Sequence, residues 1–579
     1  MSIASRHRIW KLISPAPTAS KLACEVGITP LQAQLLINRG ITEKADAAAF
    51  LCPRLSEMMD PMLMKGMEQG VAAVLEAIQH RDNITVYGDY DADGLTATAL
   101  LLNFFSDIGV PADAYVPNRL VEGYGVHSRA VQRLYQRGTG LILTVDCGIS
   151  GEREIALARK LGLKVVVTDH HQVPPGSRPC WPVINPHQPE CSFPFKDLAG
   201  VGLAFFLAVA IRAALRDRGW FNGRPEPDLR EYLDLVALGT IADRVPLVGQ
   251  NRMLAAAGLR RMPDSRWAGI RAMIEAAGVN PSAIGADDLA FRLAPRLNAP
   301  GRMGDSEAGL SILTADRDER ARDLARMLNV ANTRRRGLEQ AILDRIGAML
   351  HADEGLADRR TFILWGENWH QGVLGIVASR LVDQYHRPSL VVGIQDGVAS
   401  GSGRSIDGFH LYRALNRLSP LFDRFGGHAH AAGFRLPAAN LQDLKTELEA
   451  IAEAELTQQD LVPVIHADAH LLLREVDGQT VADVASLAPF GERNPAPVFL
   501  ARSVEVARSR VVGDRHLKLR LRQGETVHEG IGFGLGPYHP LHGARVDILF
   551  TPELNRWQGT ERIQLKVVDL RRAEGPNAA

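Results

Sequence analysis

Residues 84–94 read Ile84-Thr-Val-Tyr-Gly-Asp-Tyr-Asp-Ala-Asp-Gly94, and they decide the fold of the first half of the chain. Ile84–Tyr87 has the composition of a buried strand. Three aspartates follow at once, before a predicted helix over 95–105. In an open α/β sheet, ligands bind at the carboxyl ends of the strands. The stretch therefore predicts a parallel sheet with an acidic site at one edge.

Two further predicted strands also end in acidic residues. Asp146 follows the strand 141–145, and Asp169-His-His171 follows the strand 164–168. Asp243 ends an apolar, helix-like run over 233–242. Alternation of strands and helices favours a multidomain α/β protein with helices on both faces of a parallel sheet. We expect the three strand ends to meet in one crevice; the helices expected to cover the sheet are 152–161 and 203–215.

So many carboxylates cannot all stay ionised side by side without cations. Oxygen ligands suit Mg²⁺ or Mn²⁺, and one imidazole favours Mn²⁺. Two ions ~3.5–4 Å apart can clamp a phosphoryl group and activate a water molecule. A lone Asp-x-Asp-x-Asp run is often a solvated loop or a calcium loop, but the EF-hand glutamate is missing here. The combination predicts a two-metal site whose candidate ligands are Asp89, Asp91, Asp93, Asp146, His170 and Asp243.

The 579 residues are enough for several domains. A second strand–helix–strand pattern begins at residue 361, and it contains two segments that we expect to be glycine-rich loops, Gly401–Ser405 and Gly426–Gly433. The predicted order is an N-terminal helical lead-in (1–50), a first α/β domain (51–315), a long connecting helix (316–352), a second α/β domain (353–457), a small β-barrel of the oligonucleotide-binding type (458–573) and a disordered tail (574–579).

Leu517-Lys-Leu-Arg-Leu-Arg522 alternates apolar and basic residues, which predicts a strand with one cationic face. Seven Lys or Arg residues lie between 502 and 522, against Glu505 and Asp514. A soluble barrel surface is one interpretation, and a groove that tracks a nucleic-acid backbone is the other. The alternation favours the groove, with Lys518, Arg520 and Arg522 as its cations. For Arg334–Arg336, in the connecting helix, a solvated face and a DNA contact both stay open.

Charge, cysteine content and apolar runs limit the class of protein to which this chain belongs. Lys+Arg and Asp+Glu both total 66, so the net charge argues neither for nor against a nucleic-acid partner. Five cysteines without a Cys-x-x-Cys pair make a disulfide framework or a zinc site improbable. The longest apolar run, Leu198–Ile211, is too short to span a bilayer and is typical of a core helix. These two features lead us to expect a cytoplasmic protein that binds no membrane. No Gly-x₄-Gly-Lys-Ser/Thr motif occurs, so we expect no binding of ATP.

Four motifs resemble the signatures of the DHH phosphoesterase superfamily: Tyr87–Gly94, Thr144–Gly148, Asp169–His171 and Gly239–Asp243. Within that superfamily the chain resembles the RecJ family of bacterial single-stranded-DNA exonucleases over about residues 50–570. Ala294–Met303, Gly426–Gly433 and Pro489–Pro495 extend the resemblance. Arg493 stands where the family commonly has Gly.

The resemblance implies roles at the metal site. Asp146 would bridge two metals; Asp93, His170 and Asp243 would complete one site and Asp91 the other. Related small phosphatases carry a ligating His at the position of Tyr87, so three alternatives stay open: Asp89 serves there instead, water does, or the first metal binds weakly. The implied catalytic residues are His171, which would face the scissile phosphate, together with Asp146 and Asp89.

The resemblance also implies how the substrate is held. Asn298 and Arg302 would hold phosphates of the strand, and the nucleotide at the chain end would meet Ser402, Arg404, Gly427 and His428. Digestion would run from the 5′ end and release mononucleotides, in DNA repair and recombination, with single-strand-binding protein and a helicase as partners. Two alternatives stay open: a DHH phosphodiesterase of short oligonucleotides, although those enzymes are shorter and lack a barrel, and a non-catalytic replication scaffold, which should have lost metal ligands.

Overall fold

The computed structural model describes residues 8–177, 179–352, 355, 358–513, 515–557 and 560–573, without the side chains of 556, 557 and 560. Asp514 and the predicted tail 574–579 lie outside these residues. The chain divides into two compact units, which we describe separately. One comprises residues 59–243 and 257–463; the other comprises 8–58, 244–256 and 464–573.

The larger unit begins with a five-stranded sheet in which all strands are parallel, in the order β3-β2-β4-β5-β6. This confirms the predicted fold class. Its strands are β2 (Asn83–Tyr87), β3 (Ala112–Tyr115), β4 (Thr139–Val145), β5 (Lys164–Thr168) and β6 (Val183–Ile184). The short edge strand β3 was missed by the sequence analysis, because Ala112–Tyr115 is neither long nor apolar enough to stand out.

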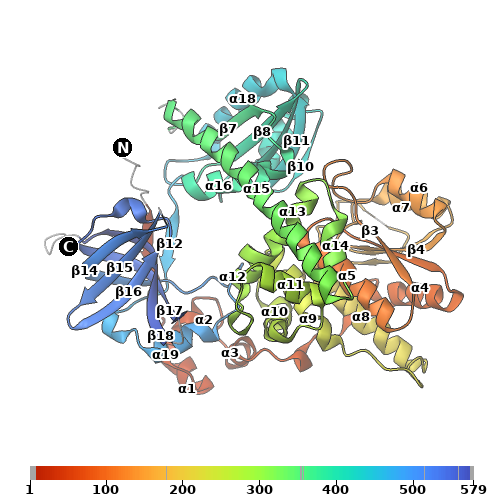
Figure 1. Cartoon of the computed structure of the whole chain (residues 1–579), viewed down its shortest axis with the longest axis horizontal. Helices are drawn as coiled ribbons and strands as arrows, with labels where there is room; N and C mark the ends of the chain where they lie inside the picture. The colour runs from red at the N-terminus through yellow and green to blue at the C-terminus, as the bar shows by residue number, and fades with distance from the viewer. Residues whose placement is uncertain are drawn as a thin grey trace. The chain divides into compact units, whose positions relative to one another are not determined.

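Helices cover both faces of this sheet (Figure 1). One face packs against α6 (Ser128–Gln136) and α7 (Glu152–Lys160), whose apolar residues join Tyr87, Ile142 and Val165 in one core. On the other face lie α4 (Met67–His80), α5 (Ala92–Asp107) and α8 (Gly200–Asp217), followed by α9 (Leu233–Ala242). The predicted core helix α8 is buried along most of its length. None of the described helices is long and apolar enough to cross a membrane.

The chain then continues through α11 (Ala268–Ala276), α12 (Ala286–Asp288), a π-helical turn (Leu289–Leu293), α13 (Ala294–Arg302) and α14 (Glu307–Leu313) to α15 (Asp318–Ala352). Helix α15 is the predicted connecting helix and has 35 residues (Figure 1). Arg335 is buried in it and lies 2.9 Å from the carboxylate of Glu339, while Arg334 and Arg336 are exposed. The three arginines therefore do not form one face.

The second α/β domain is a mixed sheet in the order β10-β11-β9-β8-β7. Its elements are β7 (Phe362–Glu367), α16 (Gln371–Tyr385), β8 (Ser389–Gln395), β9 (Val398–Arg404), α17 (Leu411–Arg417), β10 (Arg424–Gly427), β11 (Ala431–Pro437) and α18 (Leu441–Glu455). The prediction of two glycine-rich loops is wrong, because most of both segments is strand. Packing overrides the low strand propensity of glycine here. A Cβ at Gly401 would lie 2.2 Å from the ring of Phe434, and one at Gly403 would lie 2.8 Å from Leu411.

The smaller unit contains the predicted barrel, which the pairing of β14 with β17 closes. Its strands are β13 (Ala469–His470), β14 (Phe499–Val512), β15 (His516–Gln523), β16 (Thr526–Gly532), β17 (Arg545–Trp557) and β18 (Thr560–Arg572). Helix α19 (Gly478–Ser486) and the N-terminal helices α1 (Ala19–Val26), α2 (Pro30–Ile37) and α3 (Lys44–Leu51) share its apolar core. Strand β1 (Ile9–Leu12) pairs with β12 (Val464–Ala467). Arg493 has a φ of 54°, the left-handed region that favours glycine.

Candidate active site

The first turn of α5 and the start of α8 hold the aspartates that follow β2. Asp91 caps α5: its carboxylate accepts the backbone N–H groups of Asp93 and Gly94 at 3.0 and 3.1 Å. The two oxygens of Asp93 accept the N–H groups of Gly200 and Val201 at 2.6 and 2.8 Å. Amide donors at helix starts favour ionised carboxylates. Both side chains are thereby oriented before any metal binds.

Asp146 follows β4 with a φ of 59°, the left-handed region that non-glycine residues rarely occupy. This conformation presents its carboxylate to the start of α8. A Cβ at Gly200 would lie 2.8 Å from Asp146 Oδ1, so the site needs glycine at that position. The sequence analysis missed Gly200. A glycine that begins an otherwise apolar helix is the signal that could have revealed it.

All six predicted metal ligands lie together. Within each of three groups, the potential ligand atoms are all within 4.8 Å of one another. The groups are Asp89, Asp91 and Asp146; Asp93, His170 and Asp243; and Asp146, His170 and His171. Asp146 belongs to two of them, so one carboxylate joins two clusters of ligands.

The chemistry of these groups fits divalent cations. Asp89 Oδ1, Asp146 Oδ1 and His170 Nε2 are buried and form no hydrogen bond within the described part of the chain. His170 Nε2 lies 3.1 Å from Asp146 Oδ1 and 3.6 Å from Asp243 Oδ2. Burial, followed by neighbouring carboxylates, raises the pKa values of Asp89 and Asp146 well above the ordinary value of an aspartate. The same causes raise the pKa of Asp93 to about 7. Cations at this point would remove both the repulsion and the cost of the unpaired atoms.

His171 is held by a buried carboxylate and a tyrosine. Its Nδ1 lies 2.7 Å from Asp169 Oδ1 and 3.0 Å from the Tyr124 hydroxyl. Burial opposes ionisation of Asp169, but the bond to His171 lowers the pKa of this carboxyl below its ordinary value. An ionised carboxylate only accepts hydrogen bonds, so the proton between Asp169 and His171 lies on His171 Nδ1. The Tyr124 hydroxyl therefore donates its own proton to the Asp146 carbonyl, at 3.3 Å. Burial alone would lower the pKa of His171, yet Asp169 raises it to about 9.

Helix α13 carries the two predicted phosphate-binding residues of the first domain. Asn298 Oδ1 is buried and accepts no hydrogen bond from a described residue. Arg302 donates to the Gly372 carbonyl at 3.1 Å, and burial followed by nearby arginines lowers its pKa to about 9. The end of α13 touches the metal-binding loop, because a Cβ at Gly301 would lie 3.4 Å from the Tyr90 carbonyl oxygen.

The predicted residues for the chain end lie on neighbouring strands of the second α/β domain. On β9, Arg404 donates to Ser402 Oγ at 3.2 Å and to the Gly403 carbonyl at 2.8 Å. Burial and then Arg119 lower its pKa, and no described carboxylate forms an ion pair with it. Gly427 ends β10 with a φ of 147°, and a Cβ there would lie 2.2 Å from the Ala431 carbonyl oxygen. Burial, followed by the charge of His171, lowers the pKa of His428.

The cationic strand belongs to the smaller unit and is partly neutralised. Arg522 forms a bidentate pair with Glu505, with N–O distances from 2.6 Å, and Lys518 lies 3.9 Å from Glu529. Arg520 stands directly opposite Arg508, and Lys518 stands opposite Arg510. Like charges at opposed positions destabilise a sheet unless an anion lies between them. Arg508 and Arg510 were counted in the sequence analysis but were not chosen as contacts.

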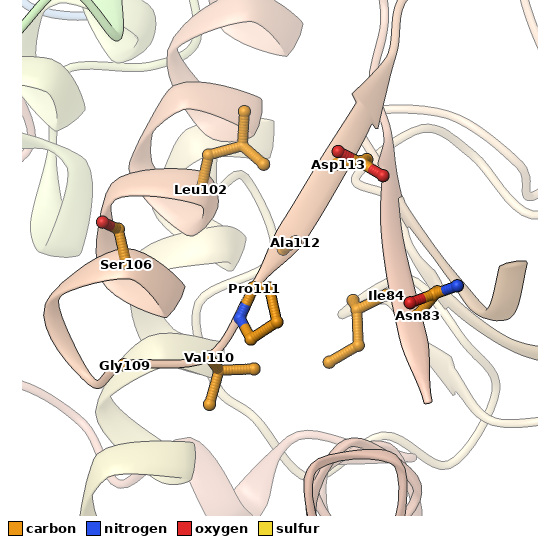
Figure 2. A pocket seen from close by; sticks show the side chains of 9 residues that line it. All are labelled: Asn83, Ile84, Leu102, Ser106, Gly109, Val110, Pro111, Ala112 and Asp113. Atoms are coloured by element: carbon orange, nitrogen blue, oxygen red, sulfur yellow. The ribbon is translucent and has the colours of Figure 1, made fainter. Parts of the chain in front are cut away.

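A cavity of about 450 Å³ lies at the other end of the first sheet. Figure 2 shows Asn83 and Ile84 of β2 beside Pro111 and the first two residues of β3, Ala112 and Asp113, with Leu102 and Ser106 of α5 opposite. These are the amino ends of the strands. Five of the six candidate ligands follow the carboxyl ends of strands, and the sixth, Asp243, lies beside His170 of that group, so this cavity is not part of the metal centre.

Models of known families match three separate parts of the chain. The DHH family N-terminal domain matches residues 83–240, and the DHHA1 domain matches residues 358–454. The RecJ OB domain matches residues 467–569.

Similarity to individual proteins extends over nearly the whole chain. The single-stranded-DNA-specific exonuclease RecJ of Bacillus subtilis is 35% identical over 98% of this chain and 71% of its own length. Crystal structures of RecJ from Thermus thermophilus in complex with Mn²⁺ and with Mg²⁺ match with TM-scores of 0.83 and 0.76. They are 32% and 31% identical, and the matches cover 98% of this chain and 80% and 79% of those chains. The fold, the acidic centre and these similarities together place the chain in the RecJ family of single-stranded-DNA-specific exonucleases.

Proposed function

We propose that this protein is an exonuclease that hydrolyses single-stranded DNA with two divalent metal ions, Mn²⁺ or Mg²⁺. The observation that carries the proposal is the position of Asp146, whose carboxylate belongs both to the group with Asp89 and Asp91 and to a group with His170. A carboxylate shared between two clusters can hold two metal ions as close together as two-metal catalysis needs. Relatives with this fold are solved with Mn²⁺ and with Mg²⁺.

Each residue has a distinct part in this proposal. Asp93, His170 and Asp243 would hold one ion, and Asp89 and Asp91 the other, with Asp146 between them. Bound there, the ions would neutralise the phosphoryl oxygens and lower the pKa of the attacking water. His171, kept protonated on Nδ1 by Asp169, would face the scissile phosphate. Tyr87 cannot replace the ligating histidine of the smaller phosphatases, because its hydroxyl donates to the Gly125 carbonyl at 3.1 Å.

Two groups of residues would hold the substrate strand, one at its phosphates and the other at its terminal nucleotide. Asn298 and Arg302 would bind its phosphates, and Ser402, Arg404, Gly427 and His428 would bind the terminal nucleotide. Arg302 and Arg404 form no ion pair with a described carboxylate, which supports this proposal. Asn298 would bind a phosphate through its Nδ2 group, because an amide oxygen only accepts. We further propose that digestion starts at the 5′ end and releases mononucleotides. The enzyme would act in DNA repair and recombination in the cytoplasm, together with single-strand-binding protein and a helicase.

The barrel would track the backbone of the remaining strand. Its outward face carries Arg508, Arg510, Lys518 and Arg520 at opposed positions of β14 and β15, which supports an anionic ligand. Arg522 contributes less in this proposal than the sequence suggests, because Glu505 neutralises it.

One assay tests the function as a whole. The protein is incubated with labelled single-stranded DNA, blunt duplex DNA and dinucleotides, with and without Mn²⁺. The proposal expects Mn²⁺-dependent digestion of the single strand and resistance of the duplex. Hydrolysis of dinucleotides alone would favour the short-oligonucleotide phosphodiesterase, and binding of the strand without any hydrolysis would favour the non-catalytic scaffold.

A further inference from the structure

One phenylalanine is strongly exposed just before helix α13, whose far end contacts the loop that carries Asp89 and Asp91. Phe291 is 75% exposed, whereas Leu289 and Leu293 on either side of it are completely buried. It lies in the π-helical turn Leu289–Leu293, which runs directly into α13. Such turns are rare and are frequently found at functional sites. Single exposed apolar side chains are common on protein surfaces, so the case for Phe291 rests on the π-helical turn and on its place before α13 and not on exposure alone.

Phe291 belongs to a stripe on one side of this helix. Phe291, Pro295, Asn298 and Arg302 are separated by four, three and four residues and are all at least partly exposed, while Ala294 and Leu297 are buried. Within α13 this spacing keeps Pro295, Asn298 and Arg302 on the same side of the helix, and Phe291 is exposed in the turn directly before them. The stripe is therefore apolar at its beginning and polar at its end.

The polar end of the stripe is the end at the metal centre. Gly301 packs against the carbonyl of Tyr90, which lies between Asp89 and Asp91. The negative charge of Asp91 acts on Arg302: it raises the pKa of Arg302 and partly offsets the larger lowering by burial. With a rise of ~1.5 Å per residue, Phe291 stands ~16 Å from Arg302 along the axis. At ~3.4 Å per stacked nucleotide this distance covers about five nucleotides, and fewer if the strand is stretched.

We propose that Phe291 is a base-stacking residue for the single strand, several nucleotides away from the reacting phosphate. The inference rests on the proposed function and names a further contact for its substrate. Phosphates held by Asn298 and Arg302 place the bases of the same strand along the stripe. An exposed aromatic ring at its far end stacks on any base, as sequence-tolerant single-strand binders require.

The test compares the binding of a labelled 12-nucleotide strand in Ca²⁺ buffer with the hydrolysis of a dinucleotide in Mn²⁺. Phe291→Ala should raise the Kd of the 12-nucleotide strand about tenfold, the effect of losing one stacked base. Phe291→Trp should restore parental binding. Tyr135→Ala, which removes a 49% exposed aromatic ring on α6, is the matched control and should bind like the parent. Dinucleotide hydrolysis should be unchanged in every variant, because a dinucleotide is too short to reach Phe291.

A single abasic nucleotide moved along the 12-nucleotide strand locates the contact. The parent should lose affinity at one position and Phe291→Ala at none. Parental affinity of Phe291→Ala would overturn the stacking role. An equal loss on dinucleotide and long strand would also overturn it, since Phe291 would then act through the structure of α13. Because binding is measured without hydrolysis, a parent that binds but does not cleave refutes the proposed function and leaves the result for Phe291 readable.

Discussion

At the scale of single residues, Asp146 is the most informative position. Its carboxylate is part of two ligand groups, so Asp146→Ala should disrupt both metal sites and remove more than 90% of turnover. Binding of a single strand should remain within about threefold of the parent, because phosphate contacts elsewhere supply most of the affinity. Asp113→Ala, at the other end of the sheet, is the control. Retention of a tenth or more of the parental turnover would refute the shared-ligand assignment.

Asp234 offers a residue-scale prediction about stability. It is 1% exposed in α9, and burial raises its pKa from 3.8 to about 6 although Trp267 Nε1 donates to it at 3.1 Å. As the pH rises, the unfolded chain releases this proton first, so the ionised carboxylate destabilises the fold from about pH 4 and fully above pH 6. Asp234→Asn should therefore be more favourable at pH 7.5 than at pH 5, by about 1 kcal/mol. An identical difference in unfolding free energy at both pH values would contradict this.

At the scale of elements, β9 presents Arg404 without a described carboxylate to balance it. If it binds the terminal phosphate, Arg404→Ala should erase any preference for a 5′-phosphate over a 5′-hydroxyl. Competition between the two forms of one oligonucleotide measures the preference. Arg435→Ala, an exposed arginine on the neighbouring strand β11, should leave it intact. A preference that survives in Arg404→Ala removes this residue from the role.

The opposed cations of β14 and β15 allow a second test at this scale. Replacing Arg508, Arg510 and Arg520 with Ser should flatten the dependence of log affinity on log salt by ~2, at ~0.7 for each lost phosphate contact. The double variant Glu505→Ser with Arg522→Ser removes a neutral pair from the same face and should keep the parental slope. Equal slopes in the parent and the triple variant would make this face an ordinary solvated surface.

These elements also show which features of the structure could be predicted from the sequence and which could not. The strand ends at Asp89, Asp146 and Asp169 were predicted because strand patterns and acidic residues are local signals. The neutralisation of Arg522 by Glu505 was not, since it depends on the register between two strands. The glycines of β9 were taken for a loop because propensity cannot show that Phe434 fills the space beside Gly401. The orientation of Asp146 by a positive φ is likewise invisible in a one-dimensional pattern.

At the scale of the whole molecule, the smaller unit is assembled from three distant stretches of chain. Arg252, from the middle stretch, is fully buried and donates to the carbonyls of Phe50, Leu487 and Ala488 at 2.9 Å. Burial lowers its pKa to about 10. Contacts between such distant segments leave no periodic trace in a sequence, so the N-terminal helices were predicted only as a lead-in. They share the apolar core of the barrel.

The dependence of activity on metal tests the central claim most directly. Chelator-treated protein should keep its fold by circular dichroism, because the cores are large and apolar. It should show no hydrolysis of single-stranded DNA. Mn²⁺ or Mg²⁺ should restore activity, Ca²⁺ should not because its looser coordination suits the clamp poorly, and calorimetric titration should give two Mn²⁺ ions per chain. Full turnover in excess chelator, or a single bound ion at full activity, would contradict the two-metal account.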